Sequence, residues 1–177
     1  MNFMERIRRI SSLIFNKNGQ LSLSFLKNGG MLLDELIVSC NGRYNIPIRN
    51  FSAKELLRAT NYFDKQLTDD AYYKIYKGSL KERLIVVKKF EEGSWSSPVN
   101  LLAIRDIVIT SQMSSHKNVA RVFGCCLEFE CPALVYEYSG DVPLDVLLYN
   151  TYKAASDTSL SLTWKSRLRI AKDIANA

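Results

Sequence analysis

Histidine and closely spaced cysteines are scarce in this sequence. It holds one histidine, His116, in 177 residues, and none of its four cysteines stands in a C-x-x-C pair. Zinc sites are built from clusters of these residue types at short spacing, so no metal site is expected. The sequence also has no apolar run of 18 residues and no N-terminal secretory signal. It therefore predicts a cytoplasmic protein with reduced thiols.

Charge of one sign is only mildly in excess. The net charge is +6, and no basic stripe interleaved with aromatic residues marks a nucleic-acid surface. A charge of this size is compatible with acidic partners or anionic lipid. The 47% hydrophobic and 24% charged content indicates a globular protein, and the length suits one ordinary domain.

The segment 83–90 has the composition of a β-strand, and residues 78–81 are expected to form the reversal before it. Alternation places Leu84, Val86, Lys88 and Phe90 on one face. A lysine on such a face has two explanations. It is either an edge-strand lysine whose ammonium reaches water, or a half-buried ammonium that needs an anion.

A helix is predicted from Ser97-Pro98 to about Ser114, because proline is favoured in the first helical turn. Steps of four, three and four then place one apolar stripe on the inward face: Leu102, Asp106, Ile109 and Met113. Asp106 is the only charge in this stripe. It either pairs with Lys88 or is a surface aspartate beside Arg105.

A second helix is predicted directly after Phe51. Ser52 is the expected N-cap and Glu55 follows three residues later, as in a capping box. Phe51 and Leu56 can form the hydrophobic staple. Upstream of this helix, residues 28–30 read as a turn, residues 31–39 as a short amphipathic helix, and residues 40–50 as a linker.

Three segments carry a family resemblance. Residues 51–63 match the pattern F-S-x-x-E-L-x-x-A-T-N-x-F, residues 115–128 resemble H-x-N-V-x-x-L-x-G-C-C-L-E, and residues 162–171 match L-x-W-x-x-R-L-x-I-A. In this combination the chain resembles the plant receptor-like kinases. The resemblance implies an α+β fold: a kinase N-lobe, with a five-stranded antiparallel sheet and its αC helix, followed by a partial helical C-lobe.

The resemblance also implies a division of the chain. Residues 1–50 form an extension with short amphipathic helices. Residues 51–138 form the N-lobe with its preceding helix. Residues 139–177 form the hinge and two helices of a C-lobe that is cut short. The last helix carries apolar residues that would then lack their usual partners and would mark a contact surface; they are Trp164, Leu168, Ile170 and Ile174.

The nucleotide site of such a kinase is altered here. Thr68, Asp70 and Tyr73 stand at the three glycine positions of the phosphate-binding loop. Glycine allows the backbone to approach the phosphates, whereas Asp70 would direct a carboxylate at them. Val86 replaces a small alanine against the adenine, and Tyr136 would be a bulky gatekeeper. ATP is therefore not expected as a cofactor.

The ion pair of the kinase site is retained in altered form. Lys88 stands at the strand lysine that pairs with ATP phosphates, and Asp106 stands at the helix glutamate, one methylene shorter. The sequence contains no H-R-D and no D-F-G motif, which supply the catalytic aspartate and the magnesium ligands. We therefore expect a pseudokinase without catalytic residues.

These departures are typical of the ZRK group of receptor-like cytoplasmic kinases. That resemblance implies an adaptor in plant immunity. It would bind a nucleotide-binding leucine-rich-repeat immune receptor and could meet pathogen effectors or other kinases. The alternatives are an ATP-binding member of the serine/threonine kinase family that acts or senses only with a partner, and a truncated product without a role. Residues 1–17 could form a basic amphipathic helix at the inner face of the plasma membrane, or could pack on the domain.

Overall fold

The computed structural model describes residues 23–40, 48–91, 99–140, 144, 147–148 and 162–177. One mixed sheet has the order β1-β5-β6-β4-β3-β2. Its strands are β1 (Arg49–Asn50), β2 (Gln66–Asp69), β3 (Tyr73–Leu80), β4 (Arg83–Phe90), β5 (Val122–Cys126) and β6 (Ala133–Glu137). The helices are α2 (Leu23–Cys40), α3 (Ala53–Ala59), α4 (Val99–Met113) and α6 (Trp164–Ala175).

Strands β2 to β6 form the predicted antiparallel sheet, but the sheet has a sixth strand. Residues 49–50, which the sequence placed in a linker, form β1 and pair with β5 in parallel. Gly124 in β5 makes this possible, since a Cβ at this position would collide with the backbone oxygen of Arg49. The short strand is then extended by a bond from Phe51 N to Cys125 O of 2.8 Å.

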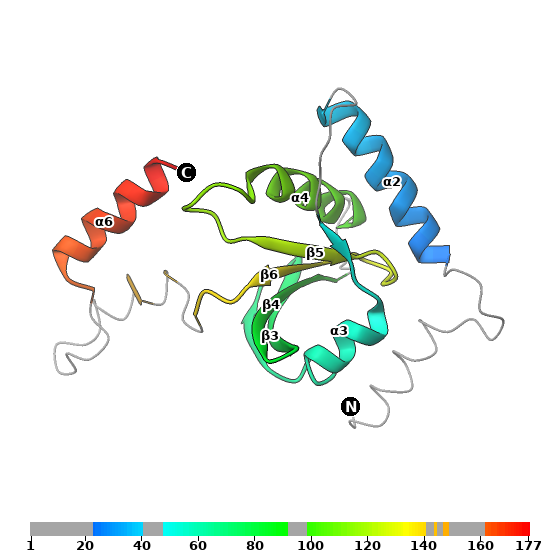
Figure 1. The fold of residues 1–177 in the computed structure, drawn as a ribbon, viewed down its shortest axis with the longest axis horizontal. Coiled ribbons are helices and arrows are strands. Elements are labelled where there is room, and N and C mark those ends of the chain that lie inside the picture. The colour runs from blue at the N-terminus through cyan, green and yellow to red at the C-terminus, as the bar shows by residue number, and fades with distance from the viewer. Residues whose placement is uncertain (1–22, 41–47, 92–98, 141–143, 145–146, 149–161) are drawn as a thin grey trace.

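The sheet separates two cores. Figure 1 shows α3 against one face of the sheet, with α4 and α2 on the other side. The first core includes Ile85 and Val87 of β4, packed with α3 residues such as Leu56. The second includes Phe90 with Ile104 and other residues of α4. Strand β4 therefore sends alternate side chains into both cores, as its sequence pattern predicts.

The predicted inward stripe of α4 is wrong. Leu102, Ile109 and Met113 are exposed, and the helix instead buries Val99, Asn100, Ala103, Ile104, Ile107 and Val108. The stripe was drawn through Asp106, which lies at the edge of the buried arc rather than at its centre. A step of one residue turns a helix by about 100°. The sheet and α2 both pack on α4, and together they bury the arc on one side of Asp106.

The turn predicted at residues 28–30 is also wrong, because α2 runs without a break through both glycines. Asn28 is fully buried and its Nδ2 donates to Leu127 O at 3.0 Å and to Phe129 O at 2.9 Å. Its Oδ1 accepts from Asn100 Nδ2 at 3.5 Å. These long-range bonds hold α2 against the loop between β5 and β6, and they offset the weak helix propensity of the two glycines.

The start of α3 confirms the predicted cap. Ser52 Oγ accepts from Glu55 N at 3.2 Å, and Phe51 and Leu56 are both buried. The reciprocal half of the capping box is replaced, because Glu55 Oε1 lies 2.6 Å from Arg49 Nη2. Another open N–H of the helix, that of Ala53, donates to the Glu128 carboxylate at 2.7 Å. Both carboxylates favour the positive end of the helix dipole.

The reversal before β4 lies at Lys81 and Glu82 rather than at residues 78–81. Both residues have positive φ, of 47° and 66°, and Gly78 lies inside β3. Gly78 is needed there for packing rather than for turning. A Cβ at this position would lie 2.8 Å from Ala59 O at the end of α3.

Helix α6 follows an N-cap in which Thr163 Oγ1 accepts from Ser166 N at 3.2 Å. Trp164, Leu168 and Ile174 are exposed and Ile170 is half-exposed, as predicted for this helix. The helix predicted near residues 144–149 and the segment 1–17 fall largely or wholly outside the described residues. Among the described helices, none is long and apolar enough to cross a membrane.

Replacement of Asn28 by alanine tests the long-range anchor of α2. The carbonyls of Leu127 and Phe129 would lose their donor inside the protein, so Asn28→Ala should lower the free energy of unfolding by about 2 kcal/mol or more. Urea denaturation would measure it. The exposed neighbour Lys27 provides the control, and Lys27→Ala should change stability by less than about 0.5 kcal/mol. Equal effects of the two substitutions would contradict the anchoring role.

Candidate functional site

Lys88 occupies a central position in the sheet. Strand β4 lies between β3 and β6, so the edge-strand explanation for this lysine is wrong. Its Nζ lies 2.9 Å from Asp106 Oδ2, and the two side chains are 20% and 28% exposed. The ammonium also lies 4.1 Å from the centroid of the Tyr73 ring. The Asp106 carboxylate therefore balances the charge of this half-buried cation, and the rings of Tyr73 and, at 5.1 Å, Phe90 add cation–π contacts.

Asp106 reaches Lys88 although it is shorter than glutamate, and α4 holds it in place. Thr110, one turn later, donates from Oγ1 to the backbone oxygen of Asp106 at 2.5 Å and to Oδ1 at 3.3 Å. The second carboxylate oxygen is thereby left for Lys88. Asp106, which the sequence analysis assigned as the helix partner of Lys88, thus forms an ion pair with its ammonium.

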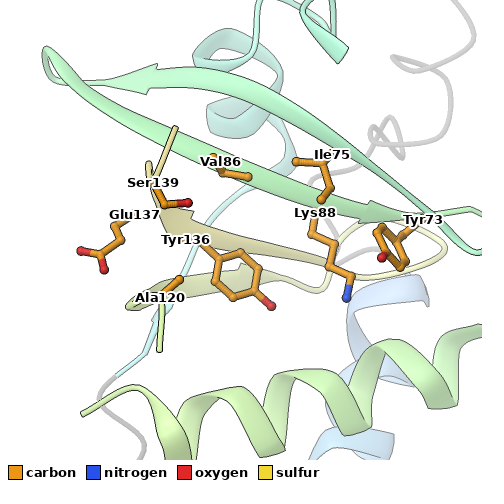
Figure 2. Close-up of a pocket in the computed structure, with 8 residues that line it drawn as sticks. All are labelled: Tyr73, Ile75, Val86, Lys88, Ala120, Tyr136, Glu137 and Ser139. Atoms are coloured by element: carbon orange, nitrogen blue, oxygen red, sulfur yellow. The ribbon is translucent and has the colours of Figure 1, made fainter. Parts of the chain in front are cut away.

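Tyr136 projects from β6 toward α4, on the same side of the sheet as Lys88 (Figure 2). Burial, and then the negative charge of Asp106, raise the pKa of its phenol well above the usual range. Tyr136 is therefore a neutral hydroxyl at any physiological pH. Its bulky ring occupies part of the space beside Lys88, in the cavity that both residues line.

The cavity around these residues has a volume of about 240 Å³. It is lined by Tyr73, Ile75, Val86, Lys88, Ala120, Tyr136, Glu137 and Ser139 (Figure 2). Pockets for drug-sized ligands usually have about 300–1,000 Å³, so this space is small for a nucleotide. Sequence reasoning missed Ile75, although alternation along β3 with Tyr73 would have found it. It also missed Ala120, Glu137 and Ser139, which come from loops and strand ends without a motif.

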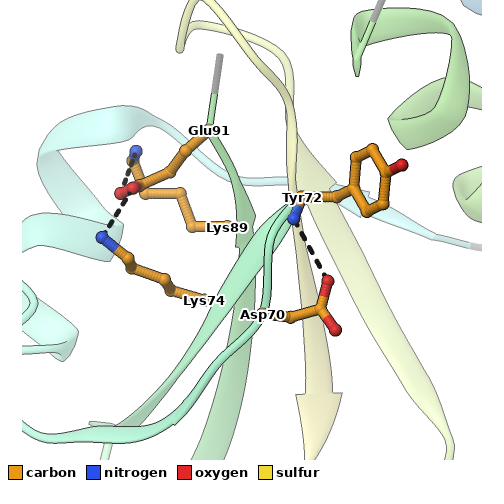
Figure 3. Close-up of polar contacts among 5 residues, drawn as sticks. All are labelled: Asp70, Tyr72, Lys74, Lys89 and Glu91. Atoms are coloured by element: carbon orange, nitrogen blue, oxygen red, sulfur yellow. Dashed lines mark hydrogen bonds and ion pairs between the residues drawn. The ribbon is translucent and has the colours of Figure 1, made fainter. Parts of the chain in front are cut away.

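The loop between β2 and β3 uses its own polar groups. Asp70 Oδ1 accepts from Tyr72 N at 3.1 Å (Figure 3). Asp70 N donates to Tyr73 O at 3.0 Å. Phosphate-binding loops depend on backbone N–H groups that remain available for the anion. Here the Asp70 carboxylate occupies one of them. Thr68 Oγ1, at the first glycine position, is buried and has no hydrogen-bond partner among the described residues.

Glu91, which directly follows β4, forms bonds to the end of this loop and to the start of β3. Its carboxylate lies 2.8 Å from Lys74 Nζ and 3.5 Å from Lys89 Nζ (Figure 3). Its backbone N donates to Tyr72 O at 3.1 Å. Burial opposes ionisation of Glu91, but the two lysines outweigh it and lower its pKa. The same contact raises the pKa of Lys74. These ion pairs join the start of β3 to the end of β4, and the backbone bond of Glu91 to Tyr72 fixes the end of the loop beside them.

This fold and this lysine–aspartate pair define a class of protein. The chain belongs to the protein kinase family: the model for protein tyrosine and serine/threonine kinases matches residues 62–177. The predicted kinase-like α+β fold is thereby confirmed.

Particular relatives place the chain further, and confirm the predicted similarity to the ZRK group. It is 44% identical over 154 residues to "Non-functional pseudokinase ZED1" of Arabidopsis thaliana, covering 86% of this chain and 43% of that protein. It is 39% identical over 160 residues to "Serine/threonine-protein kinase ZRK1" of the same plant, covering 86% and 44%. The chain thus spans less than half the length of these relatives.

Solved structures agree with this placement. The pseudokinase DRIK1 (drought responsive inactive kinase 1), in a complex with ENMD-2076, superposes with a TM-score of 0.56. Its sequence is 26% identical, and the match covers 75% of this chain and 50% of that one. Relatives named as pseudokinases therefore occur among both the sequence and the structure matches, beside relatives named as kinases.

A double-mutant cycle on Lys88 and Asp106 tests the central ion pair. Each substitution removes one charge of the pair and leaves the other half-buried without its counter-charge. Asp106→Asn and Lys88→Met should therefore each destabilise the protein by about 1–2 kcal/mol. The coupling energy between them, measured by urea denaturation, should reach about 1 kcal/mol.

The ion pair of Glu35 with Arg105 supplies the control, since it joins α2 to α4 at 3.6 Å and its arginine is 55% exposed. Glu35→Gln with Arg105→Met should show a coupling below about 0.5 kcal/mol. A Lys88–Asp106 coupling no larger than this control would mean that the central pair contributes nothing beyond a surface contact.

Proposed function

We propose that this chain is a catalytically inactive kinase-like module that acts as a cytoplasmic adaptor in plant immune signalling, and that it binds a nucleotide-binding leucine-rich-repeat immune receptor. The single observation that carries the inactive half of the proposal is the bond of the Asp70 carboxylate to the Tyr72 N–H in the β2–β3 loop, next to a cavity of only about 240 Å³. The similarity to relatives named non-functional pseudokinases supports it.

The ion pair of Lys88 with Asp106 does not by itself decide between an active and an inactive protein. Active kinases need a strand lysine paired with a helix carboxylate. The difference lies in what surrounds the pair. Tyr73 places its ring over the ammonium, and Asp70 occupies the N–H of Tyr72. An incoming triphosphate would have to displace a ring and meet a carboxylate.

The alternative function is nucleotide binding without independent catalysis. Its supporting observation is the exposure of Lys88, which keeps a fifth of its side chain accessible. A nucleotide that moved Tyr73 aside could use this ammonium as a phosphate partner. The 177 residues contain no H-R-D or D-F-G motif, so phosphoryl transfer would need groups from elsewhere.

Thermal unfolding with ATP and Mg²⁺ separates these functions. Because a ligand stabilises only the state that binds it, the wild-type chain should shift by less than about 1 °C at millimolar ATP. The variant Asp70→Gly with Tyr73→Gly reopens the loop and should gain a shift of about 2 °C or more.

Tyr72→Gly is the matched control, since it removes a neighbouring ring that does not line the cavity. It should leave the chain unresponsive to ATP. A shift of the wild-type protein as large as that expected of the reopened variant would establish the alternative function instead.

The adaptor half of the proposal is supported by the outer face of α2. Leu26, Leu33 and Ile37 recur at intervals of seven and four residues, which places them on one side of the helix. They are 57%, 49% and 53% exposed, on the side of α2 opposite buried Asn28. Apolar side chains aligned on an exposed helix face are typical of protein contact sites.

Co-purification with candidate receptors tests the adaptor role. The wild-type chain should retain at least one leucine-rich-repeat receptor, and Leu33→Asp with Ile37→Asp should reduce retention at least tenfold, because it places two charges in the contact. Val38→Asp is the control on another side of α2, where the residue is 76% exposed. Retention of no receptor, or equal retention by all variants, would contradict the proposal.

A further inference from the structure

A second hollow lies on the other side of the sheet from Lys88. It is formed by α3 and the hairpin that joins β3 to β4, and its volume is about 530 Å³. We call it the cationic groove and define it by its lining residues: Arg49, Ser52, Lys54, Glu55, Arg58, Ala59, Ser79, Leu80 and Lys81. It shares no residue with the cavity around Lys88.

The charges of the groove do not balance. Four of its residues are basic, and Glu55 is the only acidic one. Glu55 is already engaged by Arg49, at 2.6 Å. No ion pair within the described part of the chain involves Lys54, Arg58 or Lys81. Three cations therefore line one hollow without a described counter-charge.

The walls of the groove are fixed in relation to each other. Gly78 brings β3 so close to the end of α3 that no side chain fits between them. After α3, Thr60 Oγ1 donates to Leu56 O at 2.8 Å and accepts from Phe63 N at 3.1 Å, which anchors the turn. Because the backbone that carries Lys54, Arg58 and Lys81 is already fixed, binding would cost conformational entropy mainly in their side chains.

Residues with positive φ occur in two segments near the groove, after α3 and in the β3–β4 hairpin. Asn61, Tyr62 and Phe63 follow α3 with φ values of 48°, 58° and 60°. Lys81 itself has φ of 47° at the tip of the hairpin. Lys81 and Glu82 both have positive φ, as the two central residues of a tight β-hairpin turn do. This turn places Lys81 at the edge of the cationic groove.

We propose that the cationic groove binds an anionic polypeptide segment whose phosphoserine or clustered carboxylates meet Lys54, Arg58 and Lys81. The hollow lies between α3 and the β3–β4 hairpin, and a single extended segment can contact cations on both of these elements. Guanidinium and ammonium groups are the usual partners of phosphate and carboxylate. This inference does not depend on receptor binding at α2 or on the state of the cavity around Lys88.

The test uses fluorescence anisotropy of the 177-residue chain with three short labelled peptides. One carries phosphoserine among glutamates, one carries aspartate at the same position, and one is neutral. The first two should bind and the neutral peptide should not, and binding should weaken as salt rises because partly exposed charges are screened. Tighter binding of the phosphopeptide would identify phosphate as the preferred group, and equal binding would identify carboxylates.

Charge reversal locates the site. Lys54→Glu with Arg58→Glu should weaken binding at least tenfold, and Lys54→Gln with Arg58→Gln should weaken it less. Lys165→Glu with Lys172→Glu makes the same change in net charge on exposed positions of α6 and should leave binding unchanged. The unfolding temperature of every variant should match the wild-type value, because these side chains are exposed.

Three results would overturn the inference. The first is no binding of either anionic peptide, and the second is an equal loss in the α6 variant, which would indicate attraction to net charge alone. The third is binding of phosphatidylserine vesicles that Lys54→Glu with Arg58→Glu abolishes while the peptides stay unbound. In that case the cations would face a membrane.

Discussion

The placement of Lys88 in the middle of a sheet is the constraint on which much of this structure depends. A half-buried ammonium needs an anion, and among the described residues no carboxylate of the sheet forms an ion pair with Lys88. Asp106 supplies it from α4, so α4 must lie against this face at a defined rotation. Helix α2 also packs on α4, and Asn28 fixes it to the loop between β5 and β6. One charge thus organises a chain of packed elements.

The same constraint explains how the fold can persist while the phosphate site changes. The framework needs the ion pair, Gly78 against α3 and Gly124 against β1, and all are present. The altered positions 68–73 comprise the end of β2, the turn after it and the first residue of β3, at the edge of the sheet, and Asp70 is exposed in the turn. Substitutions at exposed loop positions usually change stability little. The loop is free to use Asp70 for its own closure instead of leaving N–H groups for an anion.

Much of this arrangement could be predicted because it is encoded locally. Alternation in β4 placed Val86 and Lys88 on one face, and Ser52 with Glu55 marked the start of α3. What failed was encoded at long range. Asn28 stands before two glycines, which locally favour a turn, yet its partners lie about 100 residues away and keep the helix intact. The prediction of the buried face of α4 was wrong for a similar reason, because both the sheet and α2 determine which of its residues are buried.

The two surfaces proposed for partners lie on different sides of the sheet, and this has a consequence for binding. Helix α2 packs on α4, whereas the cationic groove lies beside α3 on the opposite face (Figure 1). A partner that covers Leu33 and Ile37 leaves Lys54 and Arg58 accessible. The two proposed surfaces therefore share no residue, and the sheet lies between them. A module of this kind can join two proteins without performing any chemistry on either.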